Sequence, residues 1–294
     1  MNAEALGRLR GLLGSDAHLV MGVVNVTPDS FSDGGRFLAT ADAVAHGRRL
    51  MDEGADIVDI GGESTRPGAA PVSVEDELAR VVPVVRELAL AGAVVSIDTR
   101  HAAVAEAALD AGAVLVNDVS GLRDPRMVQV AAVRKVPVVI MHMPVDDPAT
   151  MQQHANYADV VAEVVVFLRA QAETALSAGV PQLILDPGIG FGKTAEQNVQ
   201  LLQRLEEVVA LGHPVLVGAS RKRFIDALAG APGPADRLAG TLAAHLAAVS
   251  RGARIVRVHD VAAHRQALAV WRHVWFRGEG SNPYMRDQNP LSYH

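Results

Sequence analysis

The sequence predicts one α/β domain, a single (β/α)8 TIM barrel with a short N-terminal extension and a polar C-terminal tail. Eight short apolar runs, rich in Val and Ile, are spread evenly over 294 residues, and the stretches between them have helical periodicity. Each run ends on a polar residue, as expected where parallel strands gather their carboxyl ends at one mouth. An open doubly wound sheet is the alternative, but eight even units with polar ends on all of them favour closure.

The expected strands follow one another in chain order, each with its polar end. They are His18–Val26 with Asn25, Asp56–Ile60 with the loop 61–66 that carries Glu63, Ser64, Thr65 and Arg66, Val94–Ile97 with Asp98, Val114–Val116 with Asn117 and Asp118, Val136–Met141 with His142, Leu183–Leu185 with Asp186, Val215–Val217 with the loop 218–220 that carries Ser220, and Ile255–Val256 with Arg257 and His259. These runs lack strict alternation, as expected where helices cover the outside of a sheet whose inside is also filled. We expect the extension over residues 1–17, the barrel over 18–276 and the tail over 277–294.

Helices are expected between the strands. Apolar residues recur at spacings of three and four over 78–89 and 161–176. Ser73 and Thr194 each begin a capping-box pattern, which marks a helix start. Glycines that suit a helix C-cap with positive φ come just before strands, at Gly54, Gly92, Gly112, Gly179, Gly212 and Gly252.

Composition excludes several classes of protein. The net charge of −6 and the lack of a long basic run argue against nucleic-acid binding. The chain has no Cys, so it has neither disulfides nor thiolate metal sites. The stretch 1–15 lacks the apolar segment of a signal peptide, and no window approaches the ~20 apolar residues of a membrane span. We therefore expect a soluble, cytoplasmic protein.

Two Gly-rich loops follow the first two strands. Asn25 opens the loop 27–35, and its amide oxygen suits a hard cation under a mobile loop; a capped turn is the alternative. The loop 61–68 could bring Arg66 over a bound anion, or it could be an irregular connection with a solvated Arg.

Three polar residues are expected at the ends of the third, fourth and sixth strands. Asp98, Asn117 and Asp186 could hydrogen-bond the N–H and amine edge of a nitrogen heterocycle. They could also ligate a metal, but His142 is the one His at a neighbouring strand end, and no HxH or HExxH spacing occurs. We favour heterocycle recognition.

The segment Pro187–Thr194 ends in Gly-Lys-Thr, like a phosphate-binding P-loop. The first glycine that such a loop requires is Pro187 here, so the motif fails. We interpret the segment as a flexible wall of the site, with Phe191 offering an aromatic face.

The last two strands end in cationic residues. Lys222 could be a Schiff-base nucleophile, a cation over the substrate or a surface lysine. Arg257 and His259 are two residues apart and share one face of an extended chain, opposite Asn25 across the barrel seam, which would suit pyrophosphate. The alternative for His259 is a structural histidine.

Together these residues resemble the dihydropteroate synthase family of pterin-binding barrels. The resemblance rests on the segments 21–35, 59–68, 96–99, 116–121, 186–193, 218–222 and 257–260, which span nearly the whole chain apart from its ends. The departures are Pro144, where Gln-Gly is expected, Gln197, where the family often has His, and the long polar tail.

The resemblance implies that 6-hydroxymethyl-7,8-dihydropterin pyrophosphate and 4-aminobenzoate give 7,8-dihydropteroate and pyrophosphate. It also implies Mg²⁺, a place in folate synthesis, inhibition by sulfonamides and a homodimer. The other functions to consider are a catalytically silent pterin-binding paralogue and a methyltetrahydrofolate-binding methyltransferase barrel.

The resemblance further assigns roles by matching position. The pterin would be held by Asp98, Asn117, Met141, Asp186 and Lys222. The pyrophosphate would be held by Asn25, Arg66, Arg257 and His259, with Asn25 also on the metal. The aminobenzoate would be lined by Thr65, Arg66, Phe191 and Ser220. The catalytic set would be Asp98, Asp186, Lys222 and Arg257.

Overall fold

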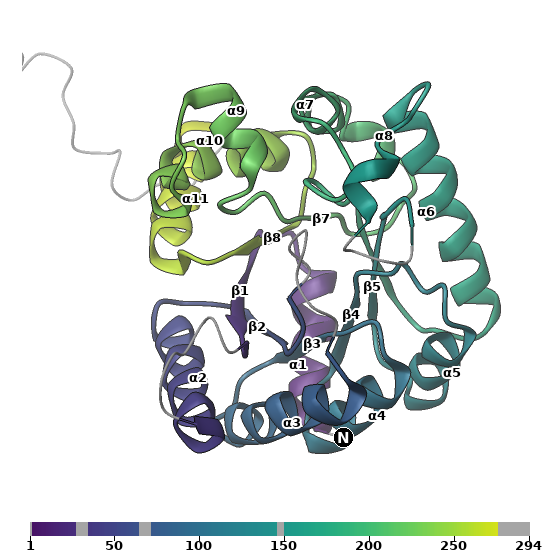
Figure 1. Ribbon diagram of the computed structural model, residues 1–294, viewed down its shortest axis with the longest axis vertical. Helices are drawn as coiled ribbons and strands as arrows, with labels where there is room; N and C mark the ends of the chain where they lie inside the picture. The colour runs from purple at the N-terminus through teal and green to yellow at the C-terminus, as the bar shows by residue number, and fades with distance from the viewer. Residues whose placement is uncertain (1, 28–34, 65–71, 146–149, 276–294) are drawn as a thin grey trace, which may run out of the picture.

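Eight parallel strands form the centre of the molecule, in the order β6-β5-β4-β3-β2-β1-β8-β7. A parallel bridge between Leu185 and Val215 joins β6 to β7 and completes the ring. Figure 1 shows most of the helices around this ring, with α1 (Ala3–Gly14) crossing the centre of the view. The predicted (β/α)8 barrel is therefore confirmed. The computed structural model describes residues 2–27, 35–64, 72–145 and 150–275.

The strands are short and almost wholly buried. They are β1 Leu19–Asn25, β2 Ile57–Gly61, β3 Val95–Asp98, β4 Leu115–Asp118, β5 Val138–Met141, β6 Leu183–Asp186, β7 Leu216–Val217 and β8 Ile255–Val258. β-Branched residues dominate them because both faces are covered, one by the barrel interior and the other by helices.

The helices alternate with the strands along the chain. They are α1 Ala3–Gly14, α2 Gly35–Asp52, α3 Val74–Leu90, α4 Ala102–Ala111, α5 Pro125–Arg134, α6 Val160–Ser177, α7 Ala195–Gln203, α8 Glu206–Val209, α9 Arg223–Ala229, α10 Leu238–Ser250 and α11 Val261–Trp275. Two short 3-10 turns, Met151–His154 and Pro234–Arg237, lie in the connections before α6 and α10.

The predicted helix boundaries are confirmed by their caps. The side chains of Ser73 and Thr194 accept the backbone N–H groups of Asp76 and Gln197, and Thr194 completes a full capping box. The six glycines expected at helix ends all have positive φ: Gly54, Gly92, Gly112, Gly179, Gly212 and Gly252. The glycines follow α2, α3, α4, α6, α8 and α10, where the chain turns toward the next strand.

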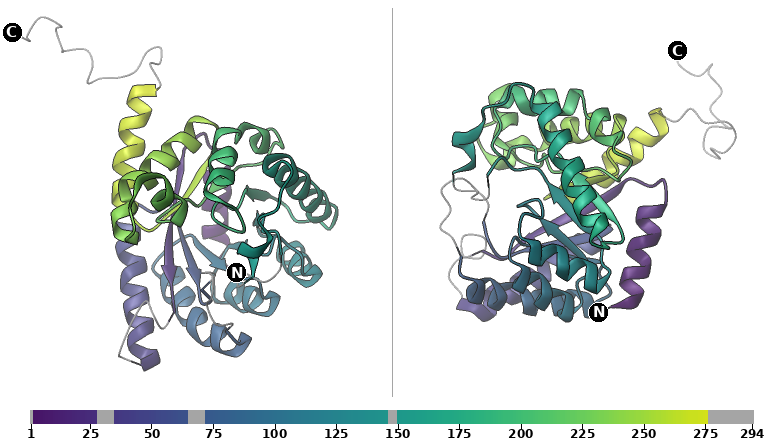
Figure 2. Two further views of the ribbon diagram at one scale, coloured as in Figure 1. Left: turned by 45° about the horizontal axis from the view of Figure 1, so that its top comes forward. Right: turned by 90° about the vertical axis from the view of Figure 1, so that its right-hand side faces the viewer.

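The N-terminal extension is a helix that closes one end of the barrel. Leu6, Leu9 and Leu13 of α1 are buried and belong to one apolar cluster with residues at the starts of the strands, among them Leu19 and Ile255. The right-hand view of Figure 2 shows α1 at one end of the barrel. Because this is the N-terminal end of the strands, their polar carboxyl ends open at the other end.

None of the helices in the described part of the chain is both long and apolar enough to cross a membrane.

The sealing role of α1 gives a prediction about stability. Replacing the fully buried Leu9 by Ala leaves a cavity, and we expect a loss of about 2–5 kcal/mol in the free energy of unfolding. Catalytic parameters at low temperature should not change, because the helix lies at the end away from the mouth. Leu90, which is 78% exposed, provides the matched control, since Leu90→Ala removes the same atoms from water-exposed surface. Equal unfolding midpoints for the two variants would contradict this role of α1.

Candidate active site

The strand register brings the polar strand ends together. Asp98 at the end of β3 pairs in register with Gly61 of β2 and Asn117 of β4, and Met141 at the end of β5 pairs with Asp186 of β6. Residues far apart in the sequence therefore become direct neighbours at the mouth. This register places Asp98, Asn117 and Asp186 at the same end of the barrel, as the sequence predicts.

Arg257 lies inside this cluster between two carboxylates. Its Nε donates to Asp59 Oδ2 at 2.6 Å, and its Nη2 donates to Asp98 Oδ2, also at 2.6 Å. Asn117 Nδ2 donates to the same Asp59 oxygen at 3.0 Å. The cluster ties β2, β3, β4 and β8 together at the level of the site.

The carboxyl group of Asp98 is strongly affected by its surroundings. Burial raises the pKa of Asp98 to about 7, against the lowering by the Arg257 guanidinium, and the carboxylates of Asp59, Glu77 and Asp118 add to the rise. A carboxylic acid with this pKa changes charge near neutral pH. Its charge at that pH is therefore sensitive to the neighbouring charges of Arg257 and Asp59.

The position of Arg257 differs from the sequence prediction. The expected strand ended at Val256 and put Arg257 opposite Asn25, but β8 extends to Val258 and Arg257 pairs with Met21 of β1. Asn25 lies further along β1, beside Gly61 of β2. A charged residue can remain within the strand because two carboxylates neutralise its guanidinium inside the barrel.

Asp186 ends β6, and Lys222 lies in the loop after β7, close enough for each charge to affect the other. One oxygen of Asp186 accepts the Gly188 N–H at 2.7 Å. Burial raises the pKa of Asp186, while the Lys222 ammonium group opposes the rise. Burial lowers the pKa of Lys222 to about 7, and Asp186 opposes that shift in turn. Lys222 is therefore no surface lysine, and one of its three predicted alternatives is excluded.

The stem of Lys222 packs over a glycine in the loop after β6. Lys222 Nζ donates to the carbonyl of Ile189 and lies 4.3 Å from the ring centre of Phe191. Gly190 has φ of +82°, and a Cβ there would come within 2.6 Å of Lys222 Cδ. Gly190 thus gives the lysine its path to the site.

The segment Pro187–Thr194 is an internally bonded wall, and the interpretation as a flexible one finds no support in its contacts. Lys193 is buried, and its Nζ donates to the carbonyls of Gly188 at 3.0 Å and Phe191 at 2.9 Å. The same Nζ lies 3.0 Å from His142 Nδ1. Burial lowers the pKa of Lys193 to about 7 and that of His142 to about 2. The lysine of this motif thus binds backbone carbonyls, where a P-loop lysine would bind phosphate.

An apolar floor lies beside these polar groups. Met141 is buried with Val119, Met143 and Met151, and Phe191 packs against the same cluster. Polarisable thioether side chains of this kind pack well against an aromatic ring system.

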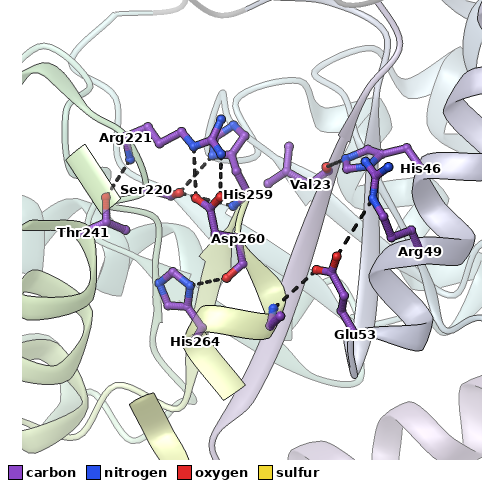
Figure 3. A network of polar contacts seen from close by, with 11 residues as sticks. Val23, His46, Arg49, Glu53, Ser220, Arg221, Thr241, His259, Asp260 and His264 are labelled. Atoms are coloured by element: carbon purple, nitrogen blue, oxygen red, sulfur yellow. Dashed lines mark hydrogen bonds and ion pairs between the residues drawn. The ribbon is translucent and has the colours of Figure 1, made fainter. Parts of the chain in front are cut away.

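The ends of β7 and β8 are joined through Ser220 and His259. Ser220 Oγ lies 2.9 Å from His259 Nδ1 and accepts the His259 backbone N–H at 3.2 Å. Next to them, the Arg221 guanidinium pairs with the Asp260 carboxylate. Figure 3 shows these contacts side by side. The two predicted ligand-binding residues thus lie in contact.

Three predicted residues remain to be placed. Asn25 ends β1 at the mouth and is partly exposed. Thr65 and Arg66 lie outside the described residues.

Sequence reasoning missed three contributors to the site. Asp59 is fully buried, and its Oδ1 has no hydrogen-bond partner among the described residues. A charge in the middle of an apolar run was the available signal for it. Lys193 belongs to the failed P-loop motif, which gave it no role. Glu63 accepts two hydrogen bonds from Arg100, at 2.9 and 3.0 Å, and so fixes the chain just after Gly62.

Known proteins of similar sequence and structure agree with this arrangement. Residues 21–259 match the family model described as pterin binding enzyme. The chain belongs to this family. Within it, the chain is 51% identical over 265 residues to the dihydropteroate synthase of Mycobacterium leprae, covering 86% of this chain and 93% of that protein. The predicted resemblance is confirmed.

A solved structure and a longer relative agree with this assignment. The dihydropteroate synthase of Thermus thermophilus in complex with 4-aminobenzoate is 56% identical, with a TM-score of 0.81 over 88% of this chain and 95% of that one. The chain is also 48% identical over 258 residues to a probable bifunctional folylpolyglutamate synthase/dihydropteroate synthase of Haloferax volcanii. That match covers 87% of this chain and 30% of the relative's length.

The charge of Asp98 gives a prediction that needs no substrate. Carbon-13 NMR of the labelled carboxyl group should show Asp98 titrating near pH 7, whereas Asp110, paired with Arg134 on the surface, should titrate below its ordinary value. Because its pKa is raised, Asp98 contributes stability that is complete below its unfolded pKa and is lost as the pH rises through about 7. Arg257→Gln should raise the pKa further. A parent titration near the ordinary value of Asp would refute this description of the site.

Proposed function

We propose that this chain condenses 6-hydroxymethyl-7,8-dihydropterin pyrophosphate with 4-aminobenzoate, giving 7,8-dihydropteroate and pyrophosphate in folate synthesis. The observation that carries the proposal is the convergence of Asp98, Asn117, Asp186 and Lys222 at one mouth, in a member of the dihydropteroate synthases. The reaction transfers a pterinylmethyl group to an aromatic amine.

The pterin is proposed to lie among the carboxylates. Asp186 has one oxygen on Gly188 N–H, which leaves the other for a ring N–H or amino group. Asp98 and Asn117 come from β3 and β4, which neighbour each other, and Met141 supplies an apolar surface. Lys222 is proposed to bind the pterin as a cation, because a pterin has no reactive aldehyde or ketone for a Schiff base.

The aminobenzoate is proposed to lie against Phe191 and Ser220. Phe191 presents its ring beside Lys222, and Ser220 is held by His259. Thr65 and Arg66 complete this site in the proposal. Sulfonamides have the shape and charge of aminobenzoate, so they should compete with it, and steady-state inhibition at several aminobenzoate concentrations would show whether they do.

The pyrophosphate is proposed to bind Asn25, Arg66, Arg257 and His259. His259 lies at the end of β8, in contact with Ser220. Arg257 has five donors, of which the carboxylates of Asp59 and Asp98 take Nε and a hydrogen of Nη2. Its guanidinium can therefore add positive charge beneath the leaving group without leaving the barrel.

Mg²⁺ is proposed to accompany the pyrophosphate. Among the described residues, no group of three or more His, Cys, Asp or Glu side chains is arranged to hold a metal ion. The donors nevertheless fit Mg²⁺, which keeps several waters and is often bound by one or two protein oxygens plus substrate phosphates. Asn25 would supply one such oxygen. When bound, the ion would neutralise charge on the leaving pyrophosphate.

The chemistry asks the protein for electrostatics more than for a base. Cleavage of the methylene C–O bond leaves positive charge on the pterin and negative charge on the pyrophosphate. In this proposal Asp98 and Asp186 would stabilise the first, and Arg257 and His259 the second, as preorganised charges do at a transition state. The aromatic amine attacks as a neutral nucleophile. No strong general base is therefore needed.

A homodimer is proposed from an apolar groove away from the mouth. The groove, of about 350 Å³, lies between α7, α9 and α10 and is lined by Leu202, Phe224, Ile225 and Leu228 among others. Leu228 is 62% exposed, so a second copy would cover apolar surface there. Sedimentation equilibrium that gave the mass of a single 31.0 kDa chain would contradict this.

A cytoplasmic location is also proposed, from the lack of Cys and of a membrane-crossing helix in the described part of the chain. Cell fractionation followed by immunoblotting would place the protein.

A turnover assay decides between the proposed function and its rivals. The chain, Mg²⁺ and both substrates should give 7,8-dihydropteroate and release one pyrophosphate per product, and neither should form without aminobenzoate. Tight pterin binding without product would instead indicate a catalytically silent paralogue. Methyl transfer from methyltetrahydrofolate would indicate the methyltransferase.

The Asp186 carboxylate gives a sharper prediction. In Asp186→Asn, the amide oxygen should stay on Gly188 N–H, so the amide NH2 faces the pterin donors. Facing donors leave a buried group unsatisfied, and we expect pterin pyrophosphate affinity to weaken by about 1–3 kcal/mol. Calorimetry measures this, with Asp110→Asn on the surface as the matched control. Unchanged affinity would remove Asp186 from the pterin site.

A further inference from the structure

Two buried histidines that the proposed chemistry does not use lie behind the last two strands. His245 of α10 is 1% exposed, and His264 of α11 is 2% exposed. His245 Nδ1 lies 2.9 Å from His264 Nε2. Burying two imidazoles needs a partner for each ring nitrogen, and both rings have them.

The partners fix the direction of the whole chain of hydrogen bonds. The backbone N–H of Ala219, which can only donate, lies 2.9 Å from His245 Nε2. His245 must therefore carry its proton on Nδ1 and donate to His264 Nε2. His264 then carries its proton on Nδ1 and donates to the carbonyl oxygen of Asp260 at 2.6 Å.

Both rings are neutral in this arrangement. Burial lowers the pKa of each histidine, and the neighbouring His264 and Lys222 lower that of His245 further, against smaller opposing effects of the Val217 backbone on His245 and of Asp260 on His264. A second proton on His245 would point an N–H at the Ala219 N–H. The geometry and the charge state thus support the same single arrangement.

These hydrogen bonds, from Ala219 through the two histidines to Asp260, are part of a closed ring of contacts. Asp260, which accepts from His264 through its carbonyl, pairs through its carboxylate with Arg221 Nε at 3.0 Å and Nη2 at 2.5 Å. Arg221 has a left-handed φ of 57°, and its own N–H donates to Thr241 Oγ1 of α10 at 3.0 Å. Figure 3 shows the Arg221, Thr241, Asp260 and His264 side of the ring.

The ring encloses the residues that carry the site. The loop from Ala219 to Lys222 bears Ser220 and Lys222, and the turn at Asp260 directly follows His259. The strained φ of Arg221 costs free energy that surrounding contacts must offset. Two of those contacts, from Ala219 and through Asp260, run through the histidine pair.

We propose that His245 and His264 are positioning residues, which hold the β7–α9 loop against the β8–α11 turn and thereby set Ser220 and Lys222 relative to Arg257 and His259. This inference rests on the proposed function for its kinetic consequence. The competing explanation is that the pair merely fills space between α10 and α11.

Variants of His245 separate the two explanations. His245→Leu fills the space but leaves the Ala219 N–H unpaired, and we expect kcat to fall by about ten- to a hundredfold, as misplaced groups cause. His245→Gln keeps an acceptor and a donor, so it should stay within about threefold of the parent. Val249→Ala, at a buried position of the same helix, is the control for lost packing. A His245→Leu kcat within about threefold of Val249→Ala would overturn the proposal.

A double variant tests whether the histidines act as one unit. His264→Leu should lower kcat as much as His245→Leu does. The double variant should lower kcat hardly more than either single variant, because each single change already breaks the series of hydrogen bonds. Multiplied losses in the double variant would show two independent effects and contradict the proposal.

A measurement without turnover distinguishes failure of this proposal from failure of the proposed function. Nitrogen-15 correlation spectra of ring-labelled protein should show both histidines neutral and protonated on Nδ1 at neutral pH. His245→Leu should shift the backbone amide signals of 219–222, and Val249→Ala should not. An Nε2-protonated His245 would overturn the proposal even in an active enzyme. A parent that makes no dihydropteroate would refute only the function.

Discussion

The guanidinium of Arg257 is the charge on which the rest of the site depends. It lies within a strand, inside a barrel, where an unpaired charge would be very costly. Asp59 and Asp98 compensate it, each at 2.6 Å, and Asn117 shares the Asp59 oxygen. These contacts join β2, β3, β4 and β8, with the carboxylates turned toward the Arg257 guanidinium. Asp98 and Asn117 lie at the carboxyl ends of their strands, so the same contacts hold polar groups at the mouth.

The opposite wall is organised by lysines that bind the backbone. Lys193 donates to carbonyls of its own loop, and Lys222 donates to the carbonyl of Ile189 while packing over Gly190. Both have a pKa lowered to about 7 by burial, so their charge depends on neighbouring carboxylates such as Asp186. A ligand that changes the surroundings of Asp186 will therefore also change the charge on this wall.

Local signals predicted the elements, and long-range contacts decided the rest. Caps at Ser73 and Thr194 and the glycines at helix ends were readable because each acts within a few residues. The register that put Arg257 beside Met21, and not Asn25, depends on charges from other strands, which periodicity does not report. The role of Asp59 was not predicted for the same reason. The extension was predicted by position, but its sealing of the barrel arises from contacts with the strand starts.

A double-mutant cycle between Asp59 and Arg257 tests most directly whether this ion cluster shapes the pterin site. Asp59→Asn, Arg257→Gln and the double variant would be titrated with pterin pyrophosphate by calorimetry. Each single change should weaken binding, and the double variant should bind almost as well as Arg257→Gln, with a coupling of about 0.5–3 kcal/mol. Independent, additive losses would show that Asp59 does not act through Arg257, and would contradict the central role of the cluster.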